Sequence, residues 1–375
     1  MSDMSDISVP APRLPSGLTR ATLIGVALLA VLSLSAAAGL RYGLLLAIGL
    51  GFGLVLEGLR FGFAGPWRAM ILRRDPAGLI AQLVSIGLVA IIAIPLIAAN
   101  GTELIGAHAP VGWAMIGGAF VFGACMQIVL GCGSGTLVNA GSGNVVSALA
   151  LPFFAIGSFA GAYHLLWWTN LGTAPIVAFS GTLGLVITLV ALAAVAGLVL
   201  FLAAPGTRRL PRRLWLAAVL LAALALANLV VAGQPWGVVY GLGLWAAKGV
   251  TAFGVDLSGS GFWALPTNQT RLAESVLTDV TSLTNIGIIG GAFIVAVWRS
   301  GLSARLPGLP ARAWIGTIIA GFLLGYASRL AFGCNVGAFF SGISTGSLHG
   351  WVWFAAAFAG SFQGIRIRRA LGLDG

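Results

Sequence analysis

Two cysteines lie in matching glycine-rich turns that each close a long apolar run. Cys132 belongs to the stretch 131–135 (GCGSG), and Cys334 belongs to the stretch 333–337 (GCNVG), 202 positions later. In the interior of a membrane, irregular backbone and polar side chains are tolerated only where they are buried in protein or line a cavity. The pattern therefore indicates a duplicated membrane protein with one thiol per half, and a pore rather than an enzyme.

The short stretches after the two cysteines favour anion binding. Residues 133–144 and 335–347 are too short to cross a membrane and too rich in glycine to face lipid, so we expect each to fold back as a hairpin or half-helix. The N-terminus of a half-helix presents unsatisfied N–H donors and about half a positive charge. Neither turn contains a carboxylate, so the sequence predicts no metal site.

Small and polar residues of the two turns are the candidates for contact with a solute. Glycines would let the backbone approach closely, and hydroxyl or amide groups would donate hydrogen bonds. The sequence leaves open whether Asn139, Asn144 and Asn335 hold the turns or bind an oxyanion. The predicted substrate-binding residues of the turns are Cys132, Gly133, Ser134, Gly135, Asn139, Cys334, Asn335 and Gly337.

Charged residues inside apolar runs are a second signal. Arg329, five residues before Cys334, and Lys248 are expected to attract an anion, and Glu57 and Arg60 also interrupt a span. The alternative for these residues is a structural ion pair or a side chain that reaches back to the membrane surface.

The third cysteine, Cys125, precedes Cys132 by seven residues on one predicted helix. The two positions are about 10.5 Å apart along the axis, too far for a disulfide within that helix. Without a CxxC pair, the chain encodes neither a structural zinc site nor a paired redox motif. Cys125 is interpreted as a small buried hydrophobe, because its counterpart in the second copy is Ala327, with an additional thiol step as the alternative.

The composition requires a lipid environment. Hydrophobic residues make up 59% of the 375 positions, charged residues 8%, and the mean hydropathy is +1.02, so a water-soluble globule is excluded. The sequence predicts an all-α, polytopic membrane protein. The candidate spans are 21–40, 43–62, 79–98, 112–131, 145–168, 176–203, 214–232, 237–253, 283–298, 313–332 and 349–365.

The net charge of +11 is distributed as short basic connections beside the spans, a pattern typical of cytoplasmic loops and not of nucleic-acid binding. Connections 99–111 and 169–175 contain no Lys or Arg and are expected on the opposite side. The predicted order is a cytoplasmic tail (1–20), a first transmembrane half (21–203), a basic cytoplasmic linker (204–213), a second half (214–366) and a cytoplasmic tail (367–375).

Two segments do not fit this scheme simply. Residues 21–40 could be a signal peptide, although a retained helix is favoured. Eleven full crossings cannot leave both termini on one side, and the polar region 254–282 is therefore expected to be re-entrant or an external excursion.

An internal repeat relates the cysteine turns. Residues 118–147 slide onto 320–349 without a gap, pairing Gly123 with Gly325 and Cys132 with Cys334. A fainter third copy places Gly62 where a cysteine would stand. The charge pattern gives the two strong copies opposite orientations, which predicts the inverted repeat of transporters. The alternative is that these glycines only let helices pack closely.

Enzyme readings are weaker. The chain contains no nucleotide-binding loop of the GxxxxGK[ST] type, and His349, which alone among the histidines lies near a cysteine turn, is expected to be a helix-end or packing residue. We predict no catalytic residue and no cofactor. A thiol-dependent enzyme that forms a persulfide on Cys132 or Cys334, and a non-transporting anchor for a sulfur carrier, remain as alternatives.

With these turns and this repeat, the sequence resembles the YeeE/YedE family of bacterial inner-membrane sulfur transporters. The resemblance rests on the two cysteine turns, with 139–141 and 341–342, and more weakly on 59–68 (LRFGFAGPWR), and it runs from about residue 43 to 365. It implies an hourglass-like helical architecture in which re-entrant elements from both faces meet. It also implies a location in the inner membrane and uptake of thiosulfate along a line of cysteines.

By this resemblance, Cys132 and Cys334 would be two of the cysteines that contact the terminal sulfur of the passing ion. The third position is Gly62 in this chain. Either Cys125 supplies a replacement thiol, or the cargo is another sulfur or selenium species. The resemblance further implies a cytoplasmic partner of the TusA type, which no segment of the sequence identifies.

Overall fold

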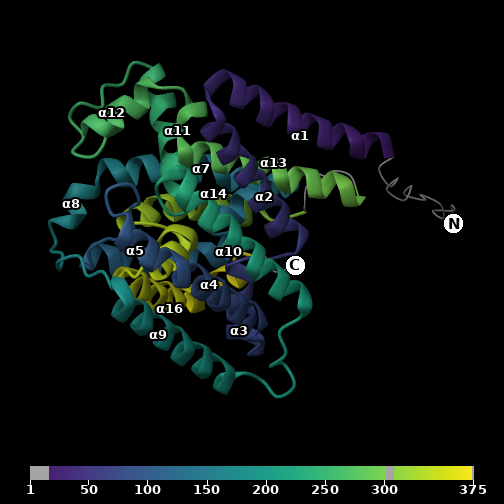
Figure 1. Cartoon of the computed structure of the whole chain (residues 1–375). Helices are drawn as coiled ribbons and strands as arrows, with labels where there is room; N and C mark the ends of the chain where they lie inside the picture. The colour runs from purple at the N-terminus through teal and green to yellow at the C-terminus, as the bar shows by residue number, and fades with distance from the viewer. Residues whose placement is uncertain (1–16, 301–307, 374–375) are drawn as a thin grey trace.

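A computed structural model describes residues 17–300 and 308–373, and within these ranges the fold is helical (Figure 1). The only pairing of extended backbone there consists of two isolated bridges, Gly112 with Thr173 and Ala178 with Ser347. Nine segments of the described chain are long and apolar enough to cross a membrane. The predicted all-α, polytopic membrane architecture is confirmed.

Each predicted span overlaps a helix, although 237–253 and 349–365 do not overlap any of the nine described segments that are long and apolar enough to cross a membrane. One of these helices, α11, has only 14 residues and is about 21 Å long, which is shorter than the roughly 30 Å of hydrocarbon in a bilayer. The number of helices therefore need not equal the number of crossings. The helices are α1 (Gly17–Ala38), α2 (Leu40–Gly58), α4 (Ala77–Ala99), α5 (Trp113–Val129), α7 (Val145–Tyr163), α9 (Gly181–Leu202), α10 (Arg212–Ala232), α11 (Val239–Ala252), α13 (Val280–Ser300), α14 (Ala311–Leu330) and α16 (Leu348–Ala370).

The polar region 254–282 forms no long helix before α13 begins. It consists of loops, α12 (Pro266–Ala273) and the short 3-10 helix η1 (Val276–Thr278), and α12 packs against α11 at the upper left of Figure 1. The side chain of Phe253 at its start is 91% exposed. The absence of a long helix agrees with the polar character of 254–282, and the choice between a re-entrant segment and an external excursion stays a prediction.

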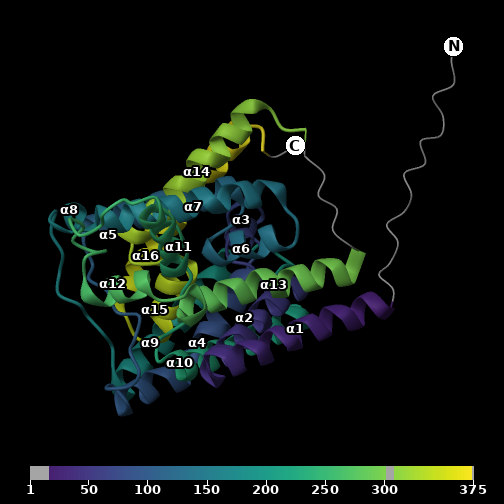
Figure 2. The same ribbon diagram turned by 90° about the horizontal axis from the view of Figure 1, so that it is seen from above.

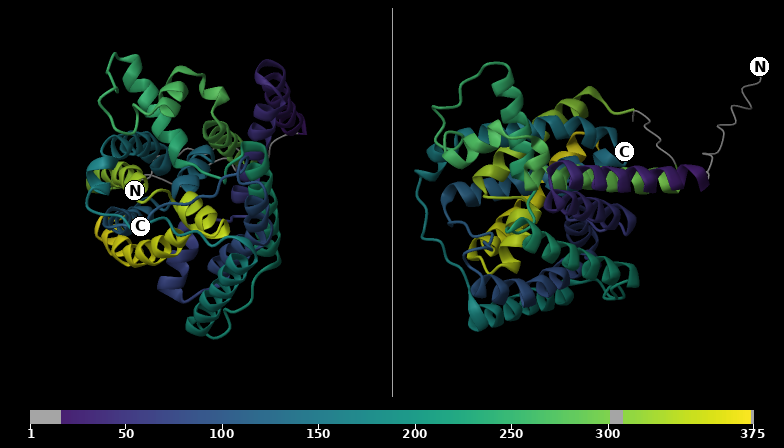
Figure 3. Two further views of the ribbon diagram at one scale, coloured as in Figure 1. Left: turned by 60° about the vertical axis from the view of Figure 1, so that its left-hand side comes forward. Right: turned by 45° about the horizontal axis from the view of Figure 1, so that its top comes forward.

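The long helices form two groups (Figures 1 and 2). In one group α2 packs against α13, α1 and α10, and α4 packs against α10 and α9. Helices α4, α9 and α10 form a layer along one side of the molecule (Figure 3). The other group contains α5, α7, α14 and α16, together with α11. Short helices join the groups, since α6 (Gly133–Gly141) contacts both α13 and α7, and α15 (Ser341–Ser344) contacts both α4 and α16.

The repeated glycines bring three pairs of helices into backbone contact. Gly53 on α2, Gly123 on α5 and Gly325 on α14 each lie nine residues before position 62, 132 or 334. A β-carbon built on each would come within 2.3, 1.9 or 2.0 Å of a carbonyl oxygen on α13, α16 or α7, respectively. No larger residue fits at these positions. Close approach of this kind stabilises helix association in lipid, where apolar burial alone gives little.

Each of the three long helices is followed by the same turn. Arg60, Leu130 and Phe332, with φ of 50°, 52° and 54°, adopt the left-handed conformation that is unusual for residues with a β-carbon. Each lies two residues before position 62, 132 or 334. The shared conformation supports the faint third copy seen in the sequence.

Short helices follow these turns, as the sequence predicts. They are α3 (Ala64–Arg73) after Gly62, α6 after Cys132, and the π-helix η2 (Asn335–Phe340) with α15 after Cys334. The opposite orientation of the two strong copies, and with it the division into halves at 204–213, stays a prediction.

Candidate functional site

The two cysteine turns meet in the interior of the protein. Cys132 caps the N-terminus of α6, where its sulfur accepts a hydrogen bond from the backbone N–H of Gly135 at 3.4 Å and lies 3.4 Å from the Oγ of Ser134. Cys334 occupies the same position before η2. A β-carbon built on Gly133 would lie only 2.9 Å from the Sγ of Cys334, so the sulfur rests against the α-carbon of the residue after Cys132. Both cysteines are fully buried.

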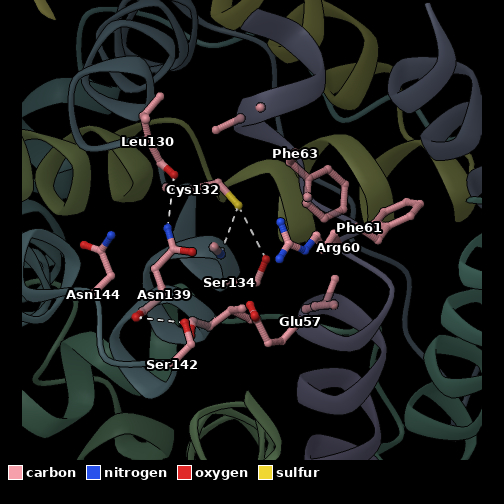
Figure 4. Close-up of a pocket in the computed structure, with 17 residues that line it drawn as sticks. Glu57, Arg60, Phe61, Phe63, Leu130, Cys132, Ser134, Asn139, Ser142 and Asn144 are labelled. Carbon is pink, nitrogen blue, oxygen red and sulfur yellow. Dashed lines mark hydrogen bonds between the residues drawn. The ribbon is translucent and has the colours of Figure 1, made fainter. Parts of the chain in front are cut away.

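A cavity of about 360 Å³ adjoins Cys132, and we call it the Cys132-side cavity (Figure 4). The sulfur of Cys132 lies near its centre, with Arg60 and Phe63 on one flank and Asn139 on the other. Gly62 lines the same cavity, and no atom lies within 4 Å of a β-carbon built there. The first element of the repeat therefore reaches this cavity but adds no thiol to it.

A second space of about 530 Å³, here called the basic cavity, extends from the Cys132-side cavity. The two share Gly65, Leu130, Asn139 and Asn144 as lining residues. The basic residues that line this extension are Arg68, Arg73 and Arg368.

A third cavity, of about 390 Å³, lies next to the Cys334 turn, and we call it the Cys334-side cavity. It is lined by Gly333 and Gly337 on either side of Cys334, and by Arg329, His349 and Val238. Val238 also touches the other turn, since one of its methyl carbons lies 3.3 Å from a β-carbon built on Gly133. Residues that line the Cys334-side cavity therefore come close, at Gly133, to the turn that lines the Cys132-side cavity.

The three asparagines near the cysteine turns differ in their hydrogen bonds. The Nδ2 of Asn139 donates to the carbonyl of Leu130 at 3.2 Å, and the Oδ1 of Asn144 accepts from the backbone N–H of Ser147 at 3.0 Å. These two side chains hold the backbone of their segment. Asn335 is fully buried, and neither polar atom of its carboxamide has a partner in the described part of the chain.

The glycines of the turns also differ. Gly133 is required because of its contact with Cys334, and Gly333 has φ of 150° and no room for a β-carbon beside the backbone N of Ala338. A β-carbon on Gly135 would meet only the Cys132 sulfur, at 3.5 Å, and one on Gly337 would meet nothing within 4 Å. Gly337 thus leaves open space in the Cys334-side cavity.

Arg329 lines the Cys334-side cavity beside two aromatic rings. Its guanidinium carbon lies 4.5 Å from the ring centre of Phe262 and 5.9 Å from that of Tyr240. Its buried Nε has no hydrogen-bond partner, and among the described residues no carboxylate pairs with it. A cation at membrane depth is costly unless a negative group approaches it, so the arrangement favours anion attraction.

Lys248 has a different environment. Its Nζ donates to the carbonyl oxygens of Leu272 and Glu274, at 2.8 and 2.5 Å. The ammonium group ties α11 to the end of α12. These contacts favour the structural alternative over anion attraction.

Cys125 lies away from the cavities that flank the cysteine pair. Its side chain is 4% exposed and packs in the main apolar cluster on α5. It does not line the Cys132-side or the Cys334-side cavity. This placement favours the packing interpretation and does not bring Cys125 to the position that Gly62 leaves without a thiol.

His349 is not only a helix-end residue. Its Nδ1 lies 2.8 Å from the Oγ of Ser347 at the start of α16, but its Nε2 has no partner in the described chain and the ring lines the Cys334-side cavity. The expectation of a packing role is therefore incomplete. His108 lines the same cavity, and its Nε2 lies 2.9 Å from the carbonyl oxygen of Thr345.

Two buried glutamines that the sequence analysis did not single out hold the first turn. The Nε2 of Gln82 donates to the carbonyl of Gly62 at 2.8 Å, and its Oε1 accepts from the indole N–H of Trp67 at 2.9 Å. The Nε2 of Gln127 donates to the carbonyl of Ala64 at 3.1 Å. Their occurrence inside apolar spans was the available signal, because uncharged polar side chains in a membrane also need partners.

In the described ranges, no cluster of three or more His, Cys, Asp or Glu side chains could hold a metal ion. The chemistry offered by the site is instead that of neutral thiols, a carboxamide, a guanidinium and backbone donors. Such a set can bind a small anion through weak hydrogen bonds.

Comparison with known proteins gives a consistent result. A family model described as sulphur transport matches residues 59–363. The probable transporter YedE of Escherichia coli is 33% identical over 136 residues, which cover 36% of this chain and 33% of that protein, and the YedE of Salmonella typhimurium is 32% identical over the same span. The chain thus matches about a third of the length of these two relatives. The thiosulfate transporter TsuA of Spirochaeta thermophila is 28% identical over 259 residues, covering 63% of this chain and 71% of that protein.

Proposed function

The chain belongs to the sulphur transport family, and we propose that it carries a small sulfur-containing anion, thiosulfate, across a bacterial inner membrane. The observation that carries the proposal is the contact between the turns of Cys132 and Cys334, each of which adjoins a different cavity. We take this contact to be the constriction between the two cavities. A solute that moves from one cavity to the other through this constriction must pass both thiols.

The distribution of charge indicates how the proposed path is oriented in the membrane. Arg60, Arg68, Arg73 and Arg368 line the Cys132-side and basic cavities. By the positive-inside rule these cavities open to the cytoplasm, and the Cys334-side cavity opens to the outside. Thiosulfate would enter near Arg329, pass Cys334 and then Cys132, and leave through the basic cavity.

The hand-over would be non-covalent. A thiol hydrogen is a weak donor, and the terminal sulfur of thiosulfate is a soft acceptor, so each contact is easily exchanged. Conduction needs binding that is strong enough to admit the ion and weak enough to release it. Arg329 would offset part of the hydration that the dianion loses on entry.

The third contact of the family pattern would be absent from this chain. Gly62 faces the Cys132-side cavity, where Arg60, Ser134, Ser142 and Asn144 supply polar groups instead of a thiol. We infer that the ion, once past Cys132, is released to oxygen and nitrogen donors. A TusA-type carrier would be the partner on the cytoplasmic side.

Uptake of labelled thiosulfate into cells that lack other routes tests the proposal. We expect Cys132→Ser and Cys334→Ser to lose most uptake while Cys125→Ser keeps it, because only the first two cysteines belong to the turns that meet. Full uptake by both of the first two variants would contradict the thiol path. A sulfur-containing product that depends on Cys132 or Cys334, formed while flux persists, would instead indicate a thiol enzyme.

A further inference from the structure

Asn335 is the least explained polar residue near the cysteine pair. Its side chain is fully buried, and both its Nδ2 and its Oδ1 lack hydrogen-bond partners among the described residues. Buried polar groups without partners are rare in native proteins, because leaving an amide unpaired is unfavourable. A carboxamide that is kept in this condition calls for a ligand that the protein itself does not provide.

A role in holding the turn does not account for Asn335. Asn139 and Asn144 hold the backbone of the Cys132 segment, and Asn285 on α13 donates from its Nδ2 to the carbonyl of Val238 at 2.9 Å. Asn335, the first residue of η2, makes no bond of this kind within the described part of the chain. The structure thus separates asparagines that brace the fold from one that does not.

Asn335 lies behind the wall of the Cys334-side cavity, where its neighbours in the chain form part of the lining. It follows Cys334 directly, and Gly333 and Gly337, two residues to either side of it, line the Cys334-side cavity. The equivalent residue after Cys132 is Gly133, whose α-carbon supports the Cys334 sulfur. Of the two positions that directly follow a cysteine in these turns, one therefore contains a carboxamide and the other a glycine.

We propose that Asn335 is a specificity-determining residue. Its carboxamide binds the oxygen atoms of a sulfur oxyanion, while the terminal sulfur of that anion contacts Cys334. This inference rests on the proposed function and adds to it the recognition of the oxygen end. The two N–H groups of a carboxamide match the acceptor-only oxygens of an oxyanion. Thiols alone recognise sulfur but give no hold on the sulfonate group, so Asn335 would favour thiosulfate over a bare sulfide.

Two measurements on Asn335 variants test the proposal, namely the efficiency of thiosulfate uptake and the melting temperature of the purified protein. Asn335→Ala should lower the efficiency of thiosulfate uptake by about 10- to 100-fold, as expected for a lost hydrogen bond to a charged group. Asn335→Asp should lose more, because a carboxylate repels the anion and cannot donate. Purified Asn335→Ala should nevertheless melt close to the wild-type temperature in detergent, since no bond within the protein is removed.

Asn285→Ala is the matched control. It removes the same number of atoms from an equally buried asparagine, but one that bonds Val238, so it should melt clearly lower than Asn335→Ala. A large loss of stability in Asn335→Ala, comparable with that of Asn285→Ala, would overturn the proposal, as would a stable Asn335→Ala with normal uptake.

A binding measurement separates this inference from the proposed function. Thiosulfate should raise the melting temperature of the wild-type protein and of Cys125→Ser, but not that of Asn335→Ala. A wild-type chain without uptake would contradict the proposed function, whereas a thiosulfate-induced shift that disappears in Asn335→Ala would still support an oxyanion ligand. An equal shift in both proteins would remove Asn335 from the binding site.

Discussion

The α-carbon of Gly133 lies against the sulfur of Cys334, so closely that a β-carbon on Gly133 would come within 2.9 Å of it. Segments about 200 positions apart thereby meet at a point where each adjoins its own cavity. This contact gives the position after Cys132 a steric role.

Gly133→Ala should therefore impair transport. The added methyl group must displace Cys334 or Val238, and overpacking of this kind costs about 1–3 kcal/mol. We expect thiosulfate uptake to fall by roughly tenfold, the change that results when about 1.4 kcal/mol of this strain raises the barrier to passage at Cys334. Gly117→Ala on the exposed face of α5, where a β-carbon meets nothing within 4 Å, is the control and should transport normally. Normal uptake by Gly133→Ala would mean that this contact yields easily.

Gly62→Cys should be tolerated. The position has free space around a β-carbon and lines the Cys132-side cavity, so the change in stability should stay within about 0.5 kcal/mol. Its thiol should react quickly with a maleimide, because position 62 lines the cavity, and thiosulfate should slow the reaction. The three native cysteines are buried and should contribute little labelling. Gly53→Cys should fail to fold, since its β-carbon would meet the carbonyl of Ile288 at 2.3 Å. Labelling of Gly62→Cys that thiosulfate leaves unchanged would place the ion elsewhere.

Gln82→Leu should destabilise the first turn. The substitution leaves the carbonyl of Gly62 and the indole N–H of Trp67 without partners in a buried region, at a cost of about 2–4 kcal/mol. We expect a clearly lower melting temperature in detergent. Gln363→Leu, at an exposed position on α16, is the control and should melt near the wild-type temperature. If the two variants melted alike, Gln82 would not support the turn.

Arg329→Gln should weaken the capture of thiosulfate. Removing the cation of the Cys334-side cavity should raise KM by about tenfold or more with a smaller change in the maximal rate, because the charge acts on entry. Arg329→Lys should be intermediate. The control is Arg271→Gln on α12, whose guanidinium pairs with Glu274 at 2.9 Å. An unchanged KM in Arg329→Gln would leave the guanidinium with a packing role against Phe262.

Much of the local structure was predictable. Apolar runs of membrane-spanning length became helices, and the glycine-rich stretches after Cys132 and Cys334 became short helices, because both outcomes depend on nearby residues. The register of Gly62 with the two cysteines also holds in the backbone, where Arg60, Leu130 and Phe332 share one unusual conformation.

Other assignments needed the three-dimensional arrangement. The sequence predicts a helix-end or packing role for His349, whereas its ring also lines a cavity. It predicts anion attraction for Lys248, whereas the ammonium group donates to two backbone carbonyl oxygens. The roles of Gln82 and Gln127 were missed because their partners lie on other elements.

The sequence by itself determined the membrane environment, the helical segments and the presence of two equivalent cysteine turns, since composition and periodicity act over short distances along the chain. Only the tertiary structure decided that Cys334 rests on Gly133 and that Cys125 lies away from the flanking cavities. It also decided that both polar atoms of the Asn335 carboxamide lack a partner among residues 17–300 and 308–373. These outcomes depend on how helices distant in the chain cross at their glycines, and that geometry is set by packing between segments rather than within them.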